Sequence, residues 1–129
     1  MTNDSHLLKQ TSREITDRLR ISGVKETVIF DIRVAVEESL RNAMIHGNKM
    51  DPEKKVTVEA DITEKNIRVC VEDEGEGFDP GSLPDPTDEE NILKTSGRGV
   101  YMIRHLMDEV KYENGGKRII MIKYLQRKH

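Results

Sequence analysis

Two neighbouring stretches of alternating residues constrain the fold more than any other feature of the sequence. In residues 56–62 and 67–72 every second residue is apolar, and the residues between them are almost all polar. Successive side chains of a β-strand point to opposite faces, so this pattern predicts two strands with one face on a core and one in water. The polar segment 63–66 is short enough to join them as an antiparallel hairpin. Such a sheet needs cover on one face only.

Three segments with apolar residues at helical spacing supply that cover. They run over residues 6–21, 25–46 and 100–107, and the middle one is the longest. Gly23 follows the last periodic residue of the first segment and acts as a stop, while Gly47-Asn48 provides the flexible end of the second.

Two further strands complete the expected sheet. Residues 108–112 and 118–125 are expected to be extended, and Asn114-Gly115-Gly116 between them is typical of a tight turn. The sequence therefore predicts an α+β, two-layer α/β sandwich with helices on one face of a mixed, mainly antiparallel four-stranded sheet. Residues 79–99 are rich in Gly and Pro, and a loop of this length is usually a lid or a binding loop.

Composition excludes several classes of protein. A chain of 129 residues fits one domain, residues 1–129, and its 21 Lys and Arg nearly balance its 24 Asp and Glu. We therefore expect no nucleic-acid partner. No apolar run is long enough for a signal peptide or a membrane span. A lone cysteine, Cys70, sits in an expected strand and fits a reducing compartment, so we expect a cytoplasmic protein with no membrane partner.

A polar stripe runs along the long central helix. Glu38, Asn42 and His46 are spaced by four residues and therefore share one face. The alternative is an ordinary solvated face, and we interpret Glu37 and Arg41, also four apart, as a surface ion pair. His46 is interpreted as a structural residue at the helix end rather than a metal ligand or a catalytic base.

An inward-facing carboxylate follows the second strand. Counting by twos from the apolar positions places Asp73 on the core side. A buried carboxylate needs a hydrogen-bond partner, which could be a protein donor or a ligand donor such as an exocyclic amine. The alternative is a strand-end Asp that caps backbone amides. Gly75 and Gly77 follow, where backbone can approach a ligand without an intervening Cβ.

A second glycine cluster lies where the long loop meets the third helix. Residues 96–100 read Ser-Gly-Arg-Gly-Val, and free backbone amides at a helix start favour phosphate. Each cluster alone is a weak signal. The chain has no Walker A loop, no His-Arg-Asp loop and no Asp-Phe-Gly, which excludes the common NTPase and eukaryotic kinase machineries.

Three motifs occur in order: Glu-x-x-x-Asn-x-x-x-His-Gly from Glu38, Asp-x-Gly-x-Gly from Asp73, and Ser-Gly-x-Gly from Ser96. Together they resemble the GHKL, or histidine-kinase-like, ATPase superfamily with its Bergerat ATP-binding fold. The resemblance spans residues 34–124 and is strongest to the anti-sigma factor serine/threonine protein kinases of bacteria.

The resemblance implies a role for each matching residue. Glu38 corresponds to the general base, Asn42 to the Mg²⁺ ligand, and Asp73 to the residue that binds the adenine amino group. The remaining ATP-binding positions that it implies are His46, Gly75, Gly77, Thr95, Ser96, Gly97, Arg98, Gly99 and Val100.

The resemblance also implies ATP and Mg²⁺ as cofactors, a sigma factor and an anti-anti-sigma (STAS-domain) protein as partners, and a homodimer by analogy. Many family kinases carry a basic residue where this chain has Thr95. A non-catalytic switch module that uses nucleotide only to bias partner binding is therefore the alternative. A detached histidine-kinase catalytic domain is a third hypothesis, against which the His46-Gly47 pair and the short lid argue.

Overall fold

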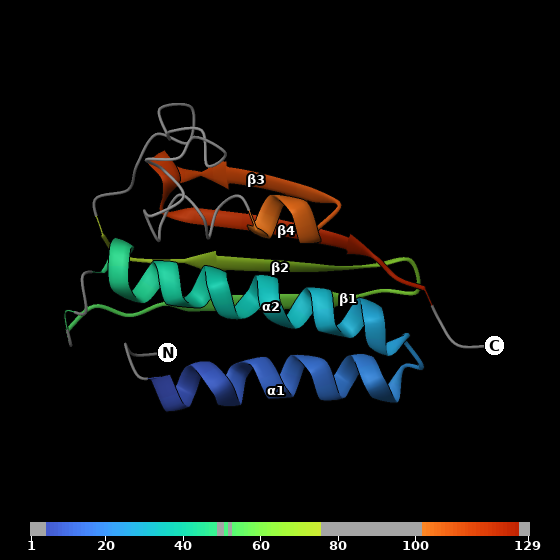
Figure 1. Cartoon of the computed structure of the whole chain (residues 1–129). Coiled ribbons are helices and arrows are strands. Elements are labelled where there is room, and N and C mark those ends of the chain that lie inside the picture. The colour runs from blue at the N-terminus through green and yellow to red at the C-terminus, as the bar shows by residue number, and fades with distance from the viewer. Residues whose placement is uncertain (1–4, 49–50, 52, 76–101, 127–129) are drawn as a thin grey trace, which may run out of the picture.

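The computed structural model describes residues 5–48, 51, 53–75 and 102–126. Two long helices and one short one cover a four-stranded sheet within these residues (Figure 1). No helix among them is long and apolar enough to cross a membrane.

The two long helices are α1 (Ser5–Ile21) and α2 (Glu26–Asn42). The chain continues from α2 into a π-helical turn, η1 (Ala43–Gly47), so the predicted helix changes its winding before its expected end. Residues 102–106 are also helical. The first two predicted helices are therefore present, and the third, predicted over 100–107, is helical over 102–106, while residues 100 and 101 lie outside the described part. The π-turn has no counterpart in the sequence-based expectation.

Gly23 ends α1 as predicted. Its φ is +80°, a left-handed conformation that glycine adopts without steric cost. The Gly23 amide donates to the Arg20 carbonyl at 3.1 Å, and the Val24 amide donates to the Leu19 carbonyl at 3.2 Å. Leu19 and Val24 are both buried. This is the Schellman arrangement, in which an apolar pair closes the helix end and turns the chain toward α2.

The sheet consists of β1 (Thr57–Ile62), β2 (Asn66–Glu72), β3 (Glu109–Glu113) and β4 (Arg118–Tyr124). The strand order is β1-β2-β4-β3, and every neighbouring pair is antiparallel. The short 3-10 turn η3 (Asn114–Gly116) joins β3 to β4. The two predicted hairpins and the α+β fold class are confirmed.

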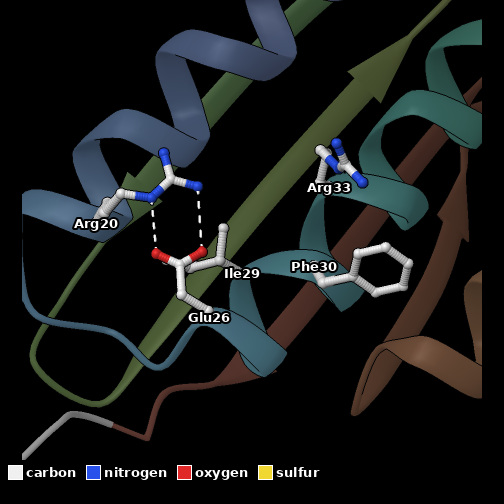
Figure 2. Close-up of a pocket in the computed structure, with 5 residues that line it drawn as sticks. All are labelled: Arg20, Glu26, Ile29, Phe30 and Arg33. Carbon is white, nitrogen blue, oxygen red and sulfur yellow. Dashed lines mark hydrogen bonds and ion pairs between the residues drawn. The ribbon is translucent and has the colours of Figure 1, made fainter.

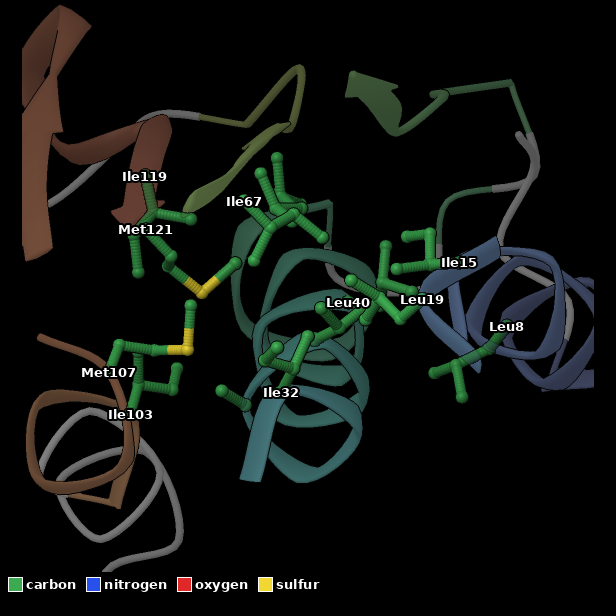
Figure 3. Close-up of a cluster of buried hydrophobic side chains, with 14 of the residues drawn as sticks. Leu8, Ile15, Leu19, Ile32, Leu40, Ile67, Ile103, Met107, Ile119 and Met121 are labelled. Atoms are coloured by element: carbon green, nitrogen blue, oxygen red, sulfur yellow. The ribbon is translucent and has the colours of Figure 1, made fainter. Parts of the chain in front are cut away.

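The core lies between the sheet and the helices, on the face that the alternation predicted. Along β2, Ile67, Val69 and Val71 are fully buried. Figure 3 shows Ile32 and Leu40 of α2 between the apolar side chains of α1 and those of the sheet. Helix α2 is thus the central element of the helical layer, and its end carries the predicted site.

Candidate functional site

The polar stripe of α2 lies at the end of the helix. Glu38 and Asn42 are both partly buried, and Asn42 is the last residue of α2. His46 belongs to the π-turn, and its side chain lies outside the described part of the structure. The stripe therefore meets the point where the helix changes winding, and π-turns are frequent at functional sites.

The predicted ion pair between Glu37 and Arg41 is wrong. Glu37 instead accepts hydrogen bonds across the helix pair, from Lys9 Nζ at 2.7 Å and from Ser12 Oγ at 3.0 Å. Arg41 Nη1 donates to Glu38 Oε1 at 2.7 Å. Spacing of four along one helix favoured the first pair, but the packing of α1 against α2 gave Glu37 closer partners.

Gly47 brings the end of the helical segment against the carboxylate of Asp73. A Cβ built on Gly47 would overlap the Asp73 carboxylate carbon and lie 2.9 Å from Oδ1. Gly47 does not have a positive φ, so its flexibility is not what the position requires. The sequence indicated a glycine that ends a helix. In the structure the absence of a Cβ at Gly47 is what allows the Asp73 carboxylate to pack against the Gly47 backbone.

Asp73 lies just beyond β2 and is half-buried, in agreement with its predicted inward direction. Its amide donates to the Lys117 carbonyl at 3.0 Å, and its Oδ1 accepts from the Gly75 amide at 2.8 Å. Burial raises the pKa of the Asp73 carboxyl above its ordinary value, and the Gly75 amide and the Lys117 charge oppose that shift. The capping interpretation is therefore confirmed, yet one amide does not fully offset the burial.

Gly75 makes a second close backbone contact. A Cβ on Gly75 would overlap the carbonyl oxygen of Gly47 and lie 2.6 Å from its carbonyl carbon. Both obstacles belong to the main chain, so they cannot rotate away. Gly47 and Gly75, which belong to different motifs, thus allow the turn after β2 to pack closely against the end of the helical segment, beside the Asp73 carboxylate.

Asn48 is a site residue that sequence reasoning missed. It is only 1% exposed. Its Nδ2 donates to the Lys55 carbonyl at 3.0 Å, and its Oδ1 accepts from the Glu74 amide at 2.8 Å. Its own amide donates to the Ala43 carbonyl at 2.8 Å and closes the π-turn. The Asn48 side-chain amide can donate and accept hydrogen bonds at the same time, which could have indicated a bridging role. We interpreted Asn48 instead as part of a flexible helix end.

Several predicted residues lie outside the described part of the chain. These are Gly77 and the phosphate-binding set Thr95, Ser96, Gly97, Arg98, Gly99 and Val100, together with the whole of the expected lid. The described residues bring Gly47, Asp73 and Gly75 into contact. Glu38 and Asn42 lie in the last turns of α2, directly before the π-turn that contains Gly47. No group of three or more potential metal-ligating His, Cys, Asp or Glu side chains occurs within the described residues.

A pocket elsewhere in the described structure does not belong to this constellation. It lies between the end of α1 and the start of α2 and is lined by Arg20, Glu26, Ile29, Phe30 and Arg33 (Figure 2). Its Arg20 guanidinium is already paired with Glu26 at 2.8 Å. Phe30 precedes Asn42 by twelve residues, or about 18 Å along an α-helix. The pocket is too far away to contribute to a site at the other end of α2.

The sequence is similar to one known domain family and to several bacterial protein kinases. The family described as histidine kinase-like ATPase domain matches residues 1–123. The serine-protein kinase RsbW of Bacillus subtilis is 33% identical over 121 residues, covering 84% of this chain and 76% of the relative. RsbW of Staphylococcus epidermidis is 35% identical over 124 residues, covering 85% and 78%.

Two solved structures have a similar fold. A mycobacterial sensor histidine kinase, MprB, covers 97% of this chain and 98% of its own, with a TM-score of 0.52 at 17% identity. The blue-light activated histidine kinase EL346 of Erythrobacter litoralis matches 79% of this chain but only 31% of its own, with a TM-score of 0.52 at 24% identity. At these identities the likeness supports the fold alone.

Proposed function

Because the chain belongs to the histidine kinase-like ATPase family, we propose that it is an ATP-dependent serine/threonine protein kinase of the GHKL type. Its relatives over most of the chain are named serine-protein kinases. The proposed substrate is the hydroxyl of a serine or threonine on an anti-anti-sigma protein with a STAS domain. The proposed second partner is a sigma factor, which the protein holds inactive.

The observation that carries the proposal is the environment of Asp73. Its carboxylate is half-buried between two glycines, and Oδ1 is held by the Gly75 amide at 2.8 Å. No hydrogen bond to Oδ2 is found from the described residues. A carboxylate oxygen in this setting favours a ligand that donates a hydrogen bond, and the exocyclic amine of adenine is such a donor.

Asn42 and Glu38 supply the other end of the proposed site. They are one turn apart on α2, so the Asn42 amide oxygen and the Glu38 carboxylate project to the same side of the helix. An amide oxygen is a hard donor that suits Mg²⁺. Bound Mg²⁺ would neutralise phosphate charge during transfer. The role of this chain's own residues is to orient the nucleotide and to accept the proton of the attacking hydroxyl.

Asn42 and Glu38 are therefore proposed to act at different steps. Asn42 contributes to Mg²⁺-dependent binding of ATP, whereas Glu38 contributes to transfer after ATP is bound. The remaining predicted ATP-binding residues, from His46 through Gly77 to the segment 95–100, keep the roles that the family resemblance implies. A homodimer also remains a proposal by analogy.

A non-catalytic switch is the second candidate function, and one sequence observation favours it. Thr95 stands where many family kinases have a basic residue. Without that charge the protein could bind ATP or ADP, change its affinity for a partner, and transfer no phosphate.

Phosphotransfer separates the two functions. The purified protein is mixed with its STAS-domain partner and labelled ATP, and phosphoserine or phosphothreonine is measured. Glu38→Ala should slow transfer by about 10²–10⁴-fold, to a residual rate that labelled ATP still detects, and leave ATP affinity unchanged. Asn42→Ala should abolish Mg²⁺-dependent ATP binding. Glu14→Ala removes an exposed carboxylate of α1 and serves as the matched control. ATP binding without phosphoprotein in the wild type would refute the kinase and leave the switch.

A further inference from the structure

Arg41 makes direct contact with the proposed general base. Its Nη1 donates to Glu38 Oε1 at 2.7 Å, one helical turn away. The Glu38 side chain is 18% exposed and that of Arg41 is 40% exposed. No described residue donates a hydrogen bond to the other carboxylate oxygen, Oε2. The contact therefore fixes one oxygen of the base and leaves the second one available.

The pairing is selective, because a competing carboxylate lies on the same helix. Glu37 stands four residues before Arg41, a spacing that favours helical ion pairs. Glu37 is instead bound by Lys9 and Ser12 of α1. Burial would raise the pKa of the Glu37 carboxyl, but these hydrogen bonds and the positive charges of Lys9 and Arg33 together outweigh burial and lower the pKa. Because the packing of α1 supplies Glu37 with its hydrogen-bond donors, Arg41 pairs with Glu38 instead.

Stability does not account for the contact between Arg41 and Glu38. Partly exposed ion pairs of this kind contribute little to the free energy of folding, because water and salt screen their attraction. A glutamate on a helix surface samples several rotamers, and a bond from a planar guanidinium reduces that freedom.

We propose that Arg41 is a positioning residue that holds Glu38 for proton abstraction; this inference rests on the proposed function. In the reaction, Oε2 of Glu38 takes the proton of the substrate hydroxyl as the hydroxyl oxygen forms its bond to the γ-phosphorus. The bond between the γ-phosphorus and the β–γ bridging oxygen breaks, and ADP leaves with that electron pair. Arg41 keeps Oε1 fixed throughout, so Oε2 faces the hydroxyl in one orientation.

The test is a double-mutant cycle on phosphotransfer with the full chain, Mg²⁺-ATP and the STAS-domain partner. Arg41→Gln should lower kcat about tenfold while the KM and the Kd for ATP stay within about twofold of wild type. Arg41→Lys should recover most of the loss, because an ammonium can still bind Oε1. In a Glu38→Gln background, Arg41→Gln should cause no further loss.

Arg33→Gln is the matched control, since it changes an arginine two turns earlier on the same helix, where it stacks on Phe30 5.2 Å from the ring centroid. It should leave kcat unchanged. An equal loss from Arg41→Gln with and without Glu38 would overturn the inference, and so would a loss confined to ATP affinity. A wild type that binds Mg²⁺-ATP but phosphorylates nothing would instead refute the proposed function, which separates the two failures.

Discussion

Asp73→Asn tests the adenine contact with the smallest change of shape. The amide is nearly isosteric with the carboxylate, and its Oδ1 can still accept the Gly75 amide that now lies at 2.8 Å. No heavy atom is added beside the Gly47 backbone, so the heavy-atom packing there is unchanged. What changes is the second oxygen, which becomes an NH₂ group and points a donor at the donor of adenine.

The size of the effect follows from the bond that is lost. A hydrogen bond to a charged acceptor in a partly buried site is worth about 1.5–3 kcal/mol. A loss of about 2 kcal/mol corresponds to a Kd for ATP that is roughly 30-fold weaker. ADP should weaken by the same factor, because it carries the same base. GTP should not weaken, since its 6-carbonyl can accept from the new NH₂ group.

The same variant should respond differently to pH. Burial raises the pKa of Asp73 in the folded state above its unfolded value of about 3.9. Between those two values the folded protein binds more protons, so the contribution of Asp73 to the free energy of unfolding falls as pH rises through that window. Asp73→Asn removes this fall. The nucleotide-free variant should therefore be at least as stable as wild type at pH 7.

Isothermal titration with ATP, ADP and GTP, with and without Mg²⁺, measures the affinities, and urea unfolding at pH 3.5 and pH 7 measures the stability. Unchanged ATP affinity in a folded Asp73→Asn protein would refute the assignment of Asp73 to adenine. Equal weakening of ATP and GTP would indicate general damage to the pocket rather than loss of one hydrogen bond.

Two further predictions concern how the site is held together. Gly75→Ala should destabilise the protein by roughly 1–3 kcal/mol, because the new Cβ meets the Gly47 carbonyl and neither backbone can rotate away; urea unfolding measures the loss, and ATP affinity should fall with it. Asn48→Ala should cost about 1–3 kcal/mol, because it removes the part-buried hydrogen bonds to the Glu74 amide and the Lys55 carbonyl. Hydrogen exchange at the Glu74 amide should accelerate.

Gly115→Ala is the control for both substitutions. Gly115 has a φ of +65°, and a Cβ there would meet nothing within 4 Å. Its cost is therefore only that of a left-handed alanine, about 1–2 kcal/mol, and ATP affinity should not change. If Gly75→Ala lowered the free energy of unfolding no more than Gly115→Ala and left ATP affinity unchanged, the close contact between Gly75 and Gly47 would not be needed for stability or for ATP binding.

Features set by local periodicity could be predicted from the sequence. The alternation in residues 56–72 determined which face of the hairpin is buried, and the same count placed Asp73 on the core side. The left-handed turn at Gly23 was also predictable, because only glycine adopts that conformation without steric cost. These features depend on residues a few positions apart, whose geometry the repeat of a strand or a helix specifies.

Contacts between distant residues were decided by the tertiary structure alone. Arg41 pairs with Glu38 rather than Glu37 because α1, whose Lys9 lies 28 residues before Glu37, supplies the stronger partners. Asn48 and Glu74 are 26 residues apart in sequence and become neighbours only when β2 ends beside η1. Helical and strand periods specify the direction of a side chain but not which of several compatible partners reaches it first, and that choice belongs to the packing of α1, α2 and the sheet.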